Sequence, residues 1–137
     1  MKIAICGSMS ASLEMMTAKE FLEKNGHSVS IPKNTEKYAS GEFTPENKRE
    51  STQNKLDHDL IRKYYRLIGE SDAVLVVNTE KRGVKSYIGG NSFLEAAFAF
   101  VLGKKLYFLN DIPDMIYTDE LKALQPIILN GDLKKIV

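Results

Sequence analysis

Residues 87–109 read Tyr-Ile-Gly-Gly-Asn-Ser-Phe-Leu-Glu-Ala-Ala-Phe-Ala-Phe-Val-Leu-Gly-Lys-Lys-Leu-Tyr-Phe-Leu, and this stretch decides the fold. A glycine pair precedes the run from Phe93 to Leu102, in which Glu95 is the only polar side chain. Such a run predicts a helix that is apolar almost all the way round. Gly103 is a natural residue to end that helix, and residues 106–109 form a new apolar run. The stretch therefore predicts a loop, a helix, a tight turn and a strand.

Glu95 is the residue of this helix that calls for an explanation. At about 100° per residue, it lies at the edge of a stripe formed by Leu94, Phe98 and Val101. A carboxylate against a buried helix is costly unless it is hydrogen-bonded or has a function. The segment from Ser92 to Glu95 also fits a capping box, in which the serine caps the helix and the glutamate reaches back to it. A structural cap and a functional acid therefore both remain open.

The rest of the chain alternates short apolar runs with segments of helical periodicity. This alternation predicts an α/β domain with a parallel sheet of four or five strands in the flavodoxin-like order 2-1-3-4-5. The length of 137 residues fits one domain, residues 1–137. Residues 129–133 could turn a hairpin or simply close the fold. The expected strands are 3–6, 28–31, 73–77 and 106–109, and the expected helices are 10–25, 56–69, 93–102 and 118–124.

The composition excludes several classes of protein. The chain is 43% hydrophobic and 27% charged, which is ordinary for a soluble globular domain. Its net charge is +1, so no basic excess indicates a nucleic-acid partner. The opening segment is too short for a signal peptide and no stretch approaches membrane-spanning length. We therefore expect a cytoplasmic protein with neither nucleic-acid nor membrane partners.

Cysteine and histidine usage points to no disulfide and no metal. Cys6 is the single cysteine, and its place in the first apolar run indicates a core residue. His27 and His58 are isolated, so they lack the spacing of metal ligands. We expect no metal site and no cofactor.

A long polar segment separates the second expected strand from the next helix. Residues 33–55 carry few apolar side chains, and the segment is longer than an ordinary connection. Loops of this length are often functional. We expect residues 33–55 to form a lid that is mobile without ligand and orders over a cleft when ligand binds.

Ligands of parallel α/β sheets bind at the carboxyl ends of the strands. Gly7 and Ser8 follow the first expected strand, and Asn78 follows the third. The loop before the helix of Glu95 reaches the same edge, where its backbone N–H groups could bind a sugar hydroxyl or a phosphate. Asp72 starts a strand at the opposite edge and is interpreted as structural. The candidate binding residues of the loop are Tyr87, Gly89, Gly90, Asn91 and Ser92.

Together these pieces resemble the nucleoside 2-deoxyribosyltransferase family and its relatives, the deoxynucleoside monophosphate N-glycosidases. The likeness covers most of the chain and is carried by residues 5–8, 71–78, 95–99 and 103–109. It implies that Glu95 is a nucleophile that attacks the anomeric carbon of a nucleoside or nucleoside monophosphate, with retention of configuration. It also implies a homodimer or larger homo-oligomer.

The chain departs from the family pattern at two acidic positions. Tyr64 stands where the family usually has an aspartate, and the loop 87–92 carries no acid where the transferases tend to have one. Cleavage of an N-glycosidic bond usually needs a group that protonates or hydrogen-bonds the departing base. The side chains of Tyr64, Asn78, Tyr87 and Asn91 could hydrogen-bond a base, but none is an obvious general acid.

Two other classes of function are compatible with such a fold. The main alternative is a non-catalytic module that binds a nucleotide or nucleotide derivative, with Glu95 acting only as a cap. A flavin carrier is less favoured, because the loop 7–12 lacks the aromatic residues expected beside a flavin ring.

The helix 93–102 also predicts assembly. Ala96 and Phe100 point away from its main stripe, so one sheet cannot cover all of its apolar faces.

Overall fold

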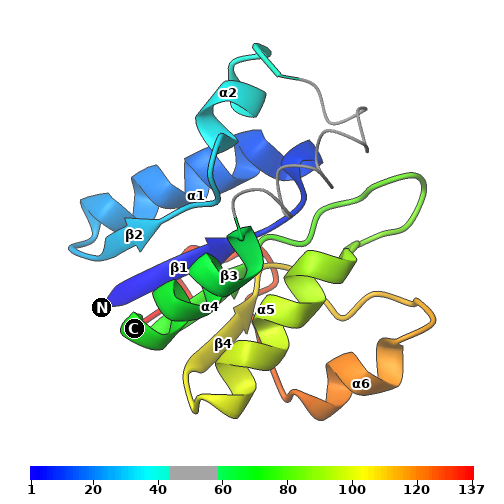
Figure 1. Ribbon diagram of the computed structural model, residues 1–137. Helices are drawn as coiled ribbons and strands as arrows, with labels where there is room; N and C mark the ends of the chain where they lie inside the picture. Colours follow the sequence, from blue (N-terminus) through cyan, green and yellow to red (C-terminus); the bar gives the residue numbers. More distant parts are fainter. Residues whose placement is uncertain (44–58) are drawn as a thin grey trace.

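A single parallel sheet organises the chain. The computed structural model describes residues 1–43 and 59–137. Its sheet has five strands in the order β2-β1-β3-β4-β5, and all neighbouring strands pair in parallel (Figure 1). The predicted fold class and strand order are therefore confirmed. The strands are β1 (Lys2–Cys6), β2 (Ser28–Ser30), β3 (Ala73–Val76), β4 (Lys105–Phe108) and β5 (Ile127–Ile128).

Helices cover both faces of the sheet, which gives three layers (Figure 1). Alternate residues of β1 point to opposite faces: Ile3 and Ile5 pack under α1, whereas Ala4 and Cys6 pack under α4 and α5. The described helices are η1 (Met9–Ala11), α1 (Ser12–Lys24), α2 (Thr35–Ala39), α4 (Leu60–Glu70), α5 (Gly90–Val101), α6 (Thr118–Ala123) and η2 (Leu133–Lys135).

Helix α5 packs on the sheet with its small residues, not with the predicted stripe. Ser92, Ala96 and Ala99 are buried, whereas Leu94 is 43% exposed and Val101 is 79% exposed. The expectation that Ala96 points outward is therefore wrong. Small side chains let the backbone of α5 approach β3 and β4 closely, so the face with the least bulk turns inward.

Gly103 ends α5 as predicted. It has a φ of +70°, a conformation that favours glycine. Its N–H donates to the carbonyl of Phe100 at 3.1 Å, and the N–H of Lys104 donates to the carbonyl of Ala99 at 2.9 Å. These two bonds form a Schellman motif, which turns the chain directly into β4.

The C-terminal segment closes the fold without a hairpin. Ile127 and Ile128 pair in parallel with β4, and the N–H of Gly131 donates to the carbonyl of Leu109 at 2.8 Å. At the other end of the sheet, the carboxylate of Asp72 accepts a bond from the N–H of Lys2 at 2.8 Å. Asp72 therefore has the structural role predicted for it.

The predicted lid falls partly outside the described residues. Residues 44–55 lie there, and so do residues 56–58 of the helix expected at 56–69, which is described from Leu60 onward. Residues 35–39 form helix α2, which packs against α1 and η1. The first part of the segment is thus ordered structure on the body of the domain. Closure over a cleft stays a prediction.

Candidate functional site

A pocket of about 490 Å³ lies where β1 and β2 end. Its lining comes from the segments that follow these two strands and from helices α4 and α5, so it occupies the sheet edge at which α/β proteins bind ligands. A volume of this size is within the range of small-molecule sites. Four of the predicted site residues line it: Gly7, Tyr64, Asn91 and Glu95.

The structure places the other predicted residues outside this lining: Ser8, Asn78, Tyr87, Gly89, Gly90 and Ser92. Asn78 has a clear structural role. It is fully buried, and its amide nitrogen donates to the carbonyls of Asn110 and Asp111 at 3.1 and 2.9 Å. Its amide oxygen accepts from the N–H of Asn110 at 2.9 Å. Asn78 therefore joins the segments that follow β3 and β4, and its polar atoms are used within the protein.

Ser8 and Tyr87 meet through Lys81, a residue that the sequence reasoning missed. The ammonium group of Lys81 donates to the hydroxyl of Ser8 at 2.9 Å and lies 5.2 Å from the centre of the Tyr87 ring. Ser8 also caps η1, since its hydroxyl accepts from the N–H of Ser10. These contacts connect the loop after β1 with the segment before α5.

The capping box predicted at Ser92 is not formed. Helix α5 begins at Gly90 with Gly89 in the N-cap position, and no side chain caps it. Ser92 lies inside the first turn on the face that packs on the sheet, so its side chain is turned into the core. Glu95 consequently lies in the second turn, beyond the residues whose N–H groups a cap would satisfy. Capping does not explain this carboxylate.

Two weakly acidic side chains interact with Glu95: the thiol of Cys6 and the phenol of Tyr64. Burial raises the pKa of the Cys6 thiol well above its ordinary value, and the charge of Glu95 and a hydrogen bond with its side chain raise that pKa further. Burial likewise raises the pKa of Tyr64, to which the charges of Cys6 and Glu95 add. The Tyr64 hydroxyl donates to the backbone carbonyl of Ile5. Tyr64 thus keeps its proton at neutral pH and uses it inside the protein.

The remaining walls are aromatic, aliphatic and basic, and the sequence analysis did not identify them. Tyr38 and Phe98 add rings to that of Tyr64, and each ring is positioned by an edge-on neighbour, Phe43 and Tyr65 respectively. Lys33 and Lys63 supply the cations. Ligands of parallel sheets bind at the carboxyl ends of the strands. The same rule, applied to β2 as it was to β1, would have selected residues 31–34. The side chains of α4 carried no comparable signal.

Gly7 is required by packing, and its replacement gives a first prediction. A Cβ atom there would lie 2.9 Å from the sulfur of Met15 and 3.2 Å from the carbonyl oxygen of Val77. We expect Gly7→Ala to lower the free energy of unfolding by about 1–3 kcal/mol, because well-packed sites resist added volume. Urea denaturation measures the change.

The control is Gly69→Ala in α4, where an added Cβ meets nothing within 4 Å. Alanine is the better helix former, so this variant is expected to be as stable as the wild type or more so. Equal effects of the two substitutions would contradict the packing argument.

The fold and the pocket define an α/β protein with a pocket at the carboxyl edge of a parallel sheet. No family model matches the chain, and no curated protein sequence matches it. Among residues 1–43 and 59–137, no helix has the length and apolar character needed to cross a membrane. In the same ranges, no cluster of three His, Cys, Asp or Glu residues could hold a metal ion. The assignment of function therefore rests on the pocket.

Proposed function

We propose that the protein cleaves or transfers the N-glycosidic bond of a nucleoside or nucleoside monophosphate, with Glu95 as the nucleophile. The observation that carries the proposal is the position of Glu95, which lines the pocket from the second turn of α5 and has no capping role. A carboxylate in an otherwise largely apolar pocket is a candidate for covalent catalysis. The resemblance of residues 95–99 to the nucleophile segment of the deoxyribosyltransferases supports the same role.

The proposed reaction has two steps. In the first, a carboxylate oxygen of Glu95 bonds to the anomeric carbon while the bond to the base breaks, and the base leaves with the electron pair. In the second, water or a second base attacks the same carbon and releases Glu95 as a carboxylate. Two displacements give retention of configuration. The rings of Tyr38, Tyr64 and Phe98 provide flat apolar surfaces against which a base or sugar can pack.

The departing base must be stabilised without help from Tyr64. The hydroxyl of Tyr64 donates to Ile5, and its raised pKa makes it a poor proton donor. Asn91 lines the pocket, and its amide can hydrogen-bond a base but cannot protonate it. We therefore expect water to supply the proton and turnover to be slow.

A second candidate function, binding without catalysis, is favoured by the scarcity of acids in the pocket. Of the described residues that line it, Glu95 is the only one with a carboxylate. A nucleotide-binding module needs no second acid. Incubation of the protein with a panel of nucleosides and nucleoside monophosphates, with and without an acceptor base, separates the two functions. Release of free base supports the enzyme, whereas binding of a panel member without any release supports the module.

The outer faces of α4 and α5 indicate a homo-oligomer, which is a further part of the proposal. Three large apolar side chains there lie outside the pocket lining and are between 44% and 79% exposed: Tyr65, Phe100 and Val101. Exposed apolar patches of this kind commonly mark protein–protein contacts.

We expect light scattering at about 50 µM to show a dimer or larger assembly. Phe100→Glu should shift it to monomer, while Leu13→Glu, at an exposed site on α1, should not. A monomeric wild type would contradict this expectation.

A further inference from the structure

Two lysines line the pocket from different walls. Lys33 comes from the segment between β2 and α2, and Lys63 comes from the first half of α4. Both side chains are exposed, so their ammonium groups can meet a ligand at the pocket opening. Neither ammonium group forms an ion pair or hydrogen bond with another residue of the described ranges 1–43 and 59–137. Their charge is thus not neutralised by that part of the chain.

The pocket consequently has a basic balance. Its described lining contains two lysines and one carboxylate, that of Glu95, and the other described lining residues are uncharged. Cations grouped at a largely apolar pocket raise the local concentration of anions. Lysine is a common partner of phosphate, which it binds as a compact charge with three donors.

We propose that the pocket selects a nucleoside monophosphate over the uncharged nucleoside, and that Lys33 and Lys63 bind its phosphate. This inference rests on the proposed function, because it names the substrate class of the same site. In a nucleoside monophosphate the sugar lies between an apolar base and a charged phosphate. The pocket has matching parts: aromatic walls, the carboxylate of Glu95, and two lysines.

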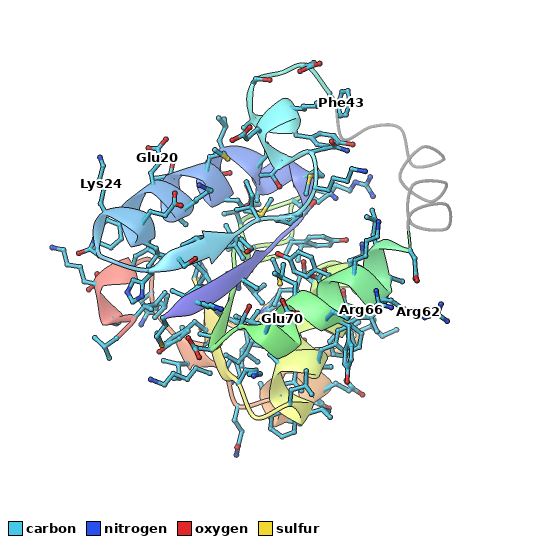
Figure 2. All side chains as sticks on the ribbon, turned by 60° about the vertical axis from the view of Figure 1, so that its left-hand side comes forward. Glu20, Lys24, Phe43, Arg62, Arg66 and Glu70 are labelled. Carbon is cyan, nitrogen blue, oxygen red and sulfur yellow. The ribbon has the colours of Figure 1, made fainter. Side chains whose placement is uncertain are left out.

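Helix α4 offers a matched control for this proposal. Arg62 and Arg66 belong to the same helix as Lys63 and are exposed, but they do not line the pocket. Figure 2 shows Arg62 directed away from the body of the domain. Arg62 also pairs with Asp59 at 3.4 Å. Replacement of Arg66 removes a positive charge from α4 without changing the pocket lining. An effect of total charge can therefore be separated from an effect of the pocket lysines.

The experiment is equilibrium binding by calorimetry. The probes are deoxyadenosine, deoxyguanosine, deoxycytidine and thymidine, their 5′-monophosphates, 2-deoxyribose with its 5-phosphate, and inorganic phosphate. We expect at least one monophosphate to bind about tenfold or more tightly than its nucleoside, and the difference to shrink as salt is raised. The double variant Lys33→Met, Lys63→Met should lose this preference. Arg66→Met and the charge-conserving Lys33→Arg, Lys63→Arg should keep most of it.

Several outcomes would overturn the proposal: equal binding of nucleosides and monophosphates, a preference that survives in the double methionine variant, or an equal loss in Arg66→Met. Inorganic phosphate binding as tightly as the best monophosphate would also overturn it, because the apolar walls would then contribute nothing. The same titrations with Glu95→Gln measure the phosphate preference in a variant that lacks the proposed nucleophile, so the two proposals are tested independently. Base release that persists in Glu95→Gln refutes the proposed nucleophile, whereas the phosphate preference depends only on the lysines.

Discussion

Replacement of Glu95 by glutamine is expected to lower the rate of base release by a factor of about a thousand or more. Glutamine keeps the size of the side chain but removes the negative charge that the nucleophile needs. Because Glu95 is not a helix cap, the variant should lose less than about 1 kcal/mol of folding stability. Chromatographic measurement of released base, with the best substrate of the panel, provides the comparison, and thermal melting checks the fold.

The matched control is Glu70→Gln. Glu70 is the last residue of α4 (Figure 2), is exposed, and is not part of the pocket lining, so turnover should stay at the wild-type level. Ligand binding should survive in Glu95→Gln, because the walls of the pocket are unchanged. A Glu95→Gln variant as active as wild type would contradict the mechanism and favour the binding module.

Stability is expected to fall steeply in alkali because of Cys6 and Tyr64. Burial raises the pKa of each group well above its ordinary value of 9.0 or 10.0, so the folded protein keeps these protons to higher pH than the unfolded chain does. The contribution of these two protonated groups to the free energy of unfolding is therefore complete below about pH 9 and decreases as the pH rises. For the thiol alone, we expect the free energy of unfolding to decrease progressively as the pH rises above 9, because only the unfolded chain then releases this proton.

Urea denaturation at several pH values measures this effect, and two variants assign it. Cys6→Ala should remove most of the decrease in the free energy of unfolding between pH 9 and 10. This holds even if the substitution lowers stability at pH 7, because the slope of stability against pH depends on ionisation and not on packing. Tyr64→Phe should act mainly above pH 10. The same alkaline slope in wild type and Cys6→Ala would show that the thiol ionises as easily in the folded state as in the unfolded chain.

The sheet could be predicted because its signal is local. The buried strands are continuous apolar runs, as expected for a sheet covered on both faces, and Ala73–Val76 is buried throughout. The right-handed crossover rule then restricts the order of such strands. Gly103 was predicted as the end of α5 because a left-handed C′ residue is a requirement of the backbone itself.

The site was predicted only in part, because a rule based on strand ends selects an edge of the sheet and not a pocket. Gly7 and Asn78 both follow strands at that edge, yet Gly7 lines the pocket whereas Asn78 is bonded to the segments after β3 and β4. The sequence contains no information about which of several amides is used within the protein. Lys33 and Lys63 were missed because exposed lysines look alike until the fold places them on one cavity.

By itself, the sequence determined the α/β class and the end of α5, since these follow from local periodicity and backbone conformation, and the crossover rule restricted the strand order. Only the tertiary structure decided how α5 is oriented: Ala96 and Ala99 face the sheet, and Leu94 is left partly exposed. The orientation of a helix that is apolar all round is set by how closely its backbone can approach the sheet. That distance depends on the packing of all the neighbouring elements and not on the helix sequence alone. The structure also decided that α5 begins at Gly90, which places Glu95 in the second turn of the helix and not at a capping position.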